Sequence, residues 1–345
     1  MTAILSAIFG CAGPVLSDTE RDFFKAANPL GFILFGRNCE DPDQLKALTA
    51  DLRNCLTRDN VPILIDQEGG RVARLKPPHW RKAPAAAAFG QMYKVDPEKA
   101  VPSARLNAVL MGQELCELGI NVDCAPLLDL TFDGASDVIG NRSYSDDPEV
   151  IAILGRAVCD GLIEAGVLPV IKHLPGHGRA MVDSHFSLPV VDTTYAELAA
   201  TDFVPFKALS DMPLGMSAHI VFTDIDPDNP ATTSRRVIDD VIRGEIGFKG
   251  FLMGDDLSME ALDGTIDQRG VASIAAGCDV VLHCNGKLDE MQAVAAALPM
   301  LTSEGLERWQ KASAITEGQT DKLYDTADNL DLLALLTEMV GDIVS

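Results

Sequence analysis

The chain has 345 residues, of which 47% are hydrophobic and 23% charged, and its formal net charge is −23 at pH 7. This composition is that of a globular protein with a large core. The acidic balance argues against a nucleic-acid or anionic-membrane partner, since both require basic patches. No apolar run reaches spanning length, and the apolar N-terminus lacks the basic start of a secretory signal. We therefore expect a cytoplasmic protein.

The eight cysteines are scattered through apolar segments and form no CxxC pair. A chain of this length does not need disulfides for stability, and disulfides are rare in the cytoplasm. We predict that most of these cysteines are buried free thiols in a reducing compartment.

Eight apolar runs bounded by turn residues recur along the chain, and each is predicted to form a buried strand. They cover Ala3–Phe9, Gly31–Phe35, Val61–Ile65, Val122–Leu128, Leu168–His173, Leu214–Ile220, Phe251–Gly254 and Val280–Cys284.

Amphipathic stretches with helix-start signals lie between most of the runs. Ser17 is followed three residues later by Glu20, as in a capping box, while Asp41-Pro42 and Asp147-Pro148 place an N-cap before a proline. Helices are expected after these three points. Further helices are expected over Ala104–Leu118, Thr194–Leu209, Ser234–Glu245, Asp267–Ala276 and Asp289–Leu298.

Apolar strands that alternate with helices indicate a parallel sheet covered on both faces, and eight such units close a (β/α)₈ TIM barrel. A doubly wound open sheet is the alternative. It would need a glycine-rich phosphate turn after the first strand, and residues 9–14 lack the GxGxxG spacing. We assign residues 1–300 to a single barrel domain. Residues 301–345 are expected to form a C-terminal helical extension packed on the barrel, with one helix over Leu330–Val340.

Charged side chains follow most of the predicted strands, at the barrel end where active sites form. They include Asp66, Arg71, Arg74, Asp129, Arg142, Lys172, His173, His219, Asp255 and His283. A buried charge without a partner is costly, so such a ring implies pairing among its members and with a polar ligand. A salt-bridge network that only stabilises the fold is the alternative. Carboxylates mixed with arginine and lysine suit a sugar better than a phosphate.

The densest group of titratable residues lies between Val170 and Pro189, with His173, His177, Asp183 and His185. The prolines and glycines between them predict a loop rather than a helix. Loops on a rigid scaffold often carry chemistry, although a polar surface loop would look similar.

His173 and His177 have the four-residue spacing of a helical metal clamp, and His185 could complete it. Pro175 and Gly176 lie between them, so no helix is expected to hold that geometry. We expect no metal and no cofactor, with a metal-dependent barrel hydrolase as the alternative.

Five motifs in order, DQEGGRVARL, VIGNRSYS, KHLPGHG, DSH and GDDLSM, resemble glycoside hydrolase family 3. More narrowly, they resemble its single-domain bacterial β-N-acetylglucosaminidases, which act in peptidoglycan recycling. The resemblance covers about residues 31–285. Gly254 and Leu174 depart from the usual pattern, which has Ser or Thr and Phe at these positions, but neither change removes a reacting group.

The resemblance implies a retaining enzyme that removes N-acetylglucosamine from muropeptides. It implies that Asp255 is the catalytic nucleophile and that His185 is the acid/base, with Asp183 as its partner. The residues that it implies for sugar binding are Asp66, Arg74, Arg142, Lys172 and His173. We expect a monomer or a weak homodimer. A non-catalytic sugar-binding barrel remains a further alternative.

Overall fold

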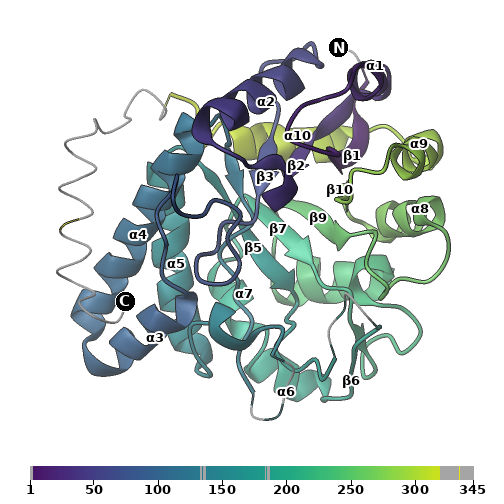
Figure 1. Cartoon of the computed structure of the whole chain (residues 1–345). Helices are drawn as coiled ribbons and strands as arrows, with labels where there is room; N and C mark the ends of the chain where they lie inside the picture. Colours follow the sequence, from purple (N-terminus) through teal and green to yellow (C-terminus); the bar gives the residue numbers. More distant parts are fainter. Residues whose placement is uncertain are drawn as a thin grey trace.

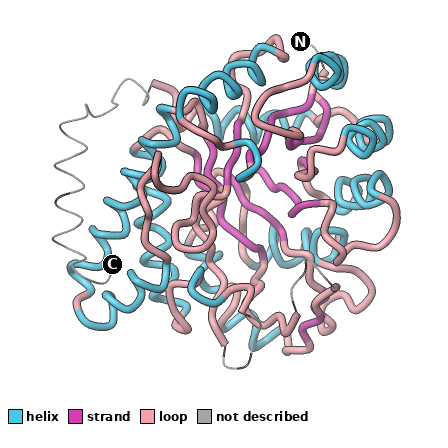
Figure 2. The backbone as a smooth tube through the Cα atoms, in the orientation of Figure 1, coloured by secondary structure: helices cyan, strands magenta, loops and turns pink. Residues whose placement is uncertain are grey.

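A computed structural model describes residues 3–132, 134, 137–182, 184, 187–318 and 334. Eight parallel strands close into a barrel in the order β1-β10-β9-β7-β5-β4-β3-β2, and they occupy the centre of Figure 2. The strands are β1 (Leu5–Gly10), β2 (Pro29–Leu34), β3 (Ile63–Ile65), β4 (Val122–Asp123), β5 (Leu168–Leu174), β7 (Leu214–Ser217), β9 (Phe251–Asp256) and β10 (Val280–His283). Because β1 pairs with both β2 and β10, the TIM barrel is confirmed and the open sheet is wrong.

Helices surround the barrel (Figure 1). They are α1 (Asp18–Ala27), α2 (Pro42–Asn54), α3 (Ala86–Val95), α4 (Pro97–Glu117), α5 (Pro148–Glu164), α6 (Tyr195–Ala200), α7 (Val204–Ala208), the π-helix η4 (Val237–Glu245), α8 (Ile266–Ala276), α9 (Leu288–Ala297) and α10 (Ser303–Ser313). The 3₁₀ turns are η1 (Gly36–Asn38), η2 (Gly140–Arg142) and η3 (Ala231–Thr233). The capping box of α1 and the aspartate caps of α2 and α5 form as predicted.

The helix predicted over Thr194–Leu209 is wrong, because the chain breaks it into α6 and α7. Asp202 lies in the break and is 1% exposed, since its carboxylate accepts a hydrogen bond from Arg179 Nε at 2.8 Å. Pro205 then lies in the first turn of α7, where its missing N–H costs nothing. Tertiary pairing of a single carboxylate therefore overrides the helical pattern.

Five other elements differ from expectation. Helix α3 was not predicted, and α4 begins at Pro97 rather than at Ala104, with Asp96 as its N-cap and Pro102 inside it. Strand β4 ends at Asp123 instead of Leu128, although Ala125, Pro126 and Leu128 still form backbone hydrogen bonds with β5. Two short strands, β6 (Val190–Val191) and β8 (Val221–Phe222), pair outside the barrel. They join the segment after β5 to the segment after β7.

The barrel interior explains how the strands position charged groups. Side chains alternate across a strand, so Leu64, Val170 and Met253 point into an interior apolar cluster. Two residues further along the same strands, the same alternation turns Asp66, Lys172 and Asp255 inward at the C-terminal end. The interior apolar layers thus form the floor beneath these charges.

The opposite end of the barrel is covered by α10. The Trp309 ring packs edge-on against Phe251, with ring centroids 5.9 Å apart. The first part of the expected C-terminal extension therefore contacts the barrel. The boundary at residue 300 remains a prediction, and the helix expected over Leu330–Val340 lies outside the described residues except for Ala334.

All eight cysteines lie within the described residues, and each is a free thiol. Six of them are buried, while Cys39 and Cys116 are partly exposed. The prediction of mostly buried, unpaired cysteines is confirmed. Among the helices in the described part of the chain, none combines the length and apolar character that crossing a membrane requires.

Candidate active site

A cavity of 290 Å³ opens at the C-terminal ends of the barrel strands. Six of the eight predicted site residues line it: Asp66, Arg74, Arg142, Lys172, His173 and Asp255. The other two, Asp183 and His185, lie outside the described residues, although Ser184 between them in the sequence lines the cavity. The structure therefore brings together every predicted site residue that it describes.

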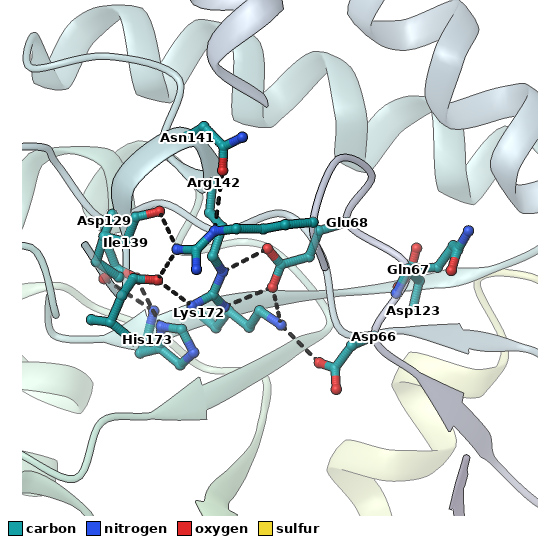
Figure 3. Close-up of polar contacts among 12 residues, drawn as sticks. Asp66, Gln67, Glu68, Asp123, Asp129, Ile139, Asn141, Arg142, Lys172 and His173 are labelled. Atoms are coloured by element: carbon teal, nitrogen blue, oxygen red, sulfur yellow. Dashed lines mark hydrogen bonds and ion pairs between the residues drawn. The ribbon is translucent and has the colours of Figure 1, made fainter. Parts of the chain in front are cut away.

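Lys172 is the centre of an ion network in this cavity (Figure 3). Its Nζ lies 2.9 Å from Asp66 Oδ1 and 2.7 Å from Glu68 Oε1. Arg142 donates two hydrogen bonds to Glu68, at 2.9 and 2.8 Å, and Arg74 donates one to Asp66 at 2.9 Å. Three cations thus neutralise two carboxylates, with one positive charge left for a ligand or for another acid.

The network fixes the charge states of its members. Burial alone would raise the pKa of Glu68, but the charges of Lys172 and Arg142 lower it to about 2. Lys172 and Arg74 likewise hold the pKa of Asp66 well below its ordinary value, against the effect of burial. Burial would lower the pKa of Lys172, yet the two carboxylates raise it above its ordinary value. All three groups are charged at neutral pH.

Asp255 differs from these carboxylates because no salt bridge joins it to any residue that the structure describes. Its Oδ1 accepts the backbone N–H of Asp256 at 2.8 Å. Burial would raise the pKa of Asp255, but the neighbouring His173 and His219 hold it below its ordinary value. The result is an ionised carboxylate on a rigid strand, with unused lone pairs beside the cavity.

Two further carboxylates belong to the site but were not among the eight predicted site residues. Glu68 lies in the same motif as Asp66, and Asp129 follows β4. Asp129 is 1% exposed, and its Oδ2 lies 2.7 Å from His173 Nδ1. Its Oδ1 accepts the backbone N–H groups of His173 and His177 at 3.3 and 2.6 Å. A count of cations against carboxylates at the strand ends would have indicated that further acids were needed.

His177 lies in the loop that follows β5 and is buried. Its Nε2 is 3.2 Å from Ser184 Oγ, and its ring packs edge-on against that of His173, with centroids 5.4 Å apart. Burial lowers the pKa of His177 to about 4, and the nearby His173 adds to this effect. His177 is therefore neutral at pH 7.

The metal alternative draws no support from this geometry. His173 Nδ1 is bonded to Asp129, and within the described ranges no group of three histidine, cysteine, aspartate or glutamate residues is arranged to hold a metal ion. His185, the third ligand of that alternative, lies outside those ranges.

A wider hollow of 540 Å³ lies at the opposite end of the barrel, beside α10. Its charged lining includes Glu304, Glu307 and Lys311, whose side chains are largely exposed. Catalytic residues of TIM barrels lie at the C-terminal ends of the strands, so the smaller cavity is the candidate site.

Comparison with known proteins shows the family of the chain. The model of the glycosyl hydrolase family 3 N-terminal domain matches residues 11–312. A β-hexosaminidase of Chromobacterium violaceum is 38% identical over 333 residues, covering 92% of this chain and 91% of that protein. A β-hexosaminidase of Bordetella avium is 38% identical over 285 residues, covering 79% of this chain and 81% of that protein.

Among solved structures, NagZ of Neisseria gonorrhoeae in complex with N-trifluoroacetyl-D-glucosamine superposes with a TM-score of 0.89 at 32% identity, covering 98% of this chain and 99% of that chain. Both the family model and the relatives span most of the sequence. The chain therefore belongs to glycosyl hydrolase family 3, and it is a glycoside hydrolase of the bacterial β-N-acetylhexosaminidase type.

Proposed function

We propose that the chain is a retaining exo-β-N-acetylglucosaminidase that removes the non-reducing terminal N-acetylglucosamine from muropeptides during cytoplasmic peptidoglycan recycling. The observation that carries this proposal is the ionised Asp255 carboxylate, which lines the cavity and forms no ion pair with a described residue, whereas Asp66 and Glu68 are both paired with cations. The relatives named above are β-hexosaminidases, and the Neisseria enzyme was solved with an N-acylglucosamine.

Asp255 is proposed to attack the anomeric carbon and form a covalent glycosyl–enzyme intermediate, which water then hydrolyses. This role needs a carboxylate that is ionised and rigidly held. The neighbouring histidines keep Asp255 ionised, and the Asp256 N–H fixes one of its oxygens. The other oxygen has no hydrogen-bond donor among the described residues, so it is available to the sugar.

The ion network is proposed to bind the sugar hydroxyls. Asp66 supplies acceptors, while Arg74 and Lys172 supply donors in fixed positions. The cavity of 290 Å³ lies at the lower limit of about 300–1,000 Å³ for pockets that enclose drug-sized ligands. We infer that it holds one terminal sugar and that the rest of the substrate lies outside, which is the geometry of an exo-acting enzyme.

His185 is proposed to protonate the leaving oxygen and then to activate water, with Asp183 orienting its ring. This assignment rests on the family motif. A histidine suits the task because its unperturbed pKa of about 6.5 is close to neutrality. His177 is a poorer candidate, since a pKa of about 4 leaves it almost entirely unprotonated at pH 7.

Leaving-group dependence tests the acid/base. A nitrophenyl aglycone needs little protonation, so His185→Ala should slow the release of an alkyl or sugar aglycone far more. Azide, which needs no base, should partly restore the deglycosylation step of the variant. His177→Ala is the matched control and should show neither effect. Equal losses for both kinds of aglycone, without rescue by azide, would remove His185 from this role.

Two simpler measurements separate the alternatives. Proton NMR of the first product should show the β-anomer, whereas an initial α-anomer would mean direct attack by water. Activity should survive excess chelator. Loss on chelation that zinc or magnesium restores would favour the metal-dependent hydrolase, and binding of N-acetylglucosamine without turnover would favour the non-catalytic barrel.

A further inference from the structure

Asp129 is a fully buried anion without a role in the mechanism above. It follows β4, whereas the described hydrogen-bond partners of its carboxylate lie in the segment from His173 to His177, at the end of β5. One oxygen bonds the His173 ring, and the other holds two backbone N–H groups on either side of Pro175-Gly176. A single carboxylate therefore fixes a cavity-lining ring together with the start of the loop that carries Ser184.

The charge of Asp129 determines where the His173 ring carries its proton. Burial would raise the pKa of Asp129, but His173 and His177 hold it below its ordinary value, so the carboxylate is ionised and can only accept. The bond of 2.7 Å to His173 Nδ1 therefore requires a proton on Nδ1. In the neutral ring, Nε2 then carries a lone pair.

His173 lines the cavity, and no other described residue forms a hydrogen bond with its Nε2. The cavity wall holds four cationic donors, namely Arg71, Arg74, Arg142 and Lys172. A sugar hydroxyl is both a donor and an acceptor, so a bound sugar also needs acceptors that are held in place. Nε2 of the neutral ring is such an acceptor.

We propose that Asp129 is a positioning residue, which makes His173 Nε2 an acceptor for a sugar hydroxyl and anchors the turn from which the β5 loop leaves. This inference rests on the proposed glycosidase function and concerns the same site. The role requires a carboxylate at position 129. An amide of the same shape would still accept the two backbone N–H groups, but its NH₂ group would donate a hydrogen bond to His173 Nδ1. The ring proton would then move to Nε2, and the atom that faces the sugar would become a donor.

Asp129→Asn tests this reversal. Its matched control is Asp279→Asn, an equally isosteric change in a buried carboxylate at the opposite end of the barrel that also accepts a backbone N–H, from Leu252. For a chromogenic N-acetylglucosaminide, Asp129→Asn should raise KM and lower kcat/KM by about 10- to 100-fold, the scale of leaving one buried polar group without its hydrogen-bond partner. The control should remain close to the wild-type values. Equal kinetics of the two variants would overturn the proposal.

Nitrogen-15 NMR of histidine-labelled protein gives a readout that does not depend on activity. The His173 signal, identified by its loss in His173→Gln, should show Nδ1–H in the wild type and Nε2–H in Asp129→Asn. The same tautomer in both proteins would overturn the proposal. If Asp129→Asn does not fold, the wild-type spectrum is sufficient as a test. An Nε2–H tautomer of His173 in the wild type would overturn the proposal. A wild-type protein without glycosidase activity would refute the proposed function, while the tautomer would still report on Asp129.

Discussion

Buried ion pairs hold both ends of this barrel. At the N-terminal end, Asp279 precedes β10, and its carboxylate accepts the Leu252 N–H at 2.9 Å, Arg243 at 3.2 Å and Arg308 at 2.7 Å. These partners come from β9, η4 and α10, so one acid ties three elements together. These three hydrogen bonds of the Asp279 carboxylate are all made within the protein.

The C-terminal end uses the same kinds of residue but leaves one acid open. Asp66 and Glu68 are paired with cations, whereas Asp255 accepts one backbone N–H and forms no ion pair with a described residue. A paired carboxylate stabilises the fold at either end. An ionised but unpaired carboxylate beside a cavity is instead available for chemistry, because its partner must be the substrate.

Removing the open acid should separate activity from stability most sharply. We expect Asp255→Ala to lose at least about 10³-fold in kcat. Its thermal unfolding midpoint should stay close to that of the wild type, because no ion pair is lost. Steady-state kinetics and a thermal melt check both expectations. Retention of more than about a tenth of the wild-type rate would exclude Asp255 as the nucleophile.

Removing the central cation should damage both properties. Lys172→Met leaves two buried carboxylates less compensated, a change that typically costs about 3–5 kcal/mol of unfolding free energy, and it also removes a donor to the sugar. Urea unfolding and KM measure the two effects. Arg243→Met is the matched change at the other end and should lower stability alone, since Arg308 still pairs with Asp279. A stable Lys172→Met with wild-type KM would contradict this comparison.

Acid should weaken the C-terminal network in a defined pH range. The folded pKa of Glu68, about 2, lies below its ordinary value of 4.5, so the unfolded chain binds the proton first as the pH falls. The stabilisation is fully present above about pH 4.5 and is lost between there and pH 2, amounting to at most about 3 kcal/mol. Urea unfolding at pH 5 and pH 3 should show a smaller difference in Glu68→Gln than in the wild type. If the stability of both proteins falls by the same amount between pH 5 and pH 3, Glu68 is not the source of this pH dependence.

Changing the acid at the N-terminal end should have the smallest effect on catalysis. Asp279→Asn keeps an acceptor for Leu252 but weakens the bonds to two arginines, which should cost about 1–3 kcal/mol of stability. We expect kcat/KM, measured well below the melting temperature, to stay within about twofold of the wild-type value. A large fall in kcat/KM without a fall in stability would mean that the two ends are coupled.

Local patterns were sufficient to predict the barrel. Each of the eight apolar runs contains or overlaps one barrel strand, because strands buried on both faces are apolar throughout. The caps at Ser17, Asp41 and Asp147 were also predictable, because the residues that identify a helix N-cap lie within four positions of one another. Strands β6 and β8 were not predictable, because two residues are too few to show a period.

The predictions for the site were limited by long-range pairing. Lys172 and Asp255 could be placed from their positions at strand ends. The role of Glu68 depends on Arg142, which lies 74 residues away in sequence, and that of Asp129 on His173, 44 residues away. Sequence position alone does not show which acidic side chain in a motif turns toward which cation. Those pairings follow only once the strands are ordered around the barrel.

The proposed covalent bond between Asp255 and the sugar can be trapped directly. Net retention alone does not prove this bond, because the acetamido group of a substrate can also act as the nucleophile and give the same anomer. A fluorinated N-acetylglucosaminyl donor with a good leaving group should accumulate on the enzyme, and peptide mass spectrometry should find the sugar mass on Asp255 in the wild type and nowhere in Asp255→Ala. A label on another residue, or an unlabelled enzyme that turns the donor over with retention, would contradict the account.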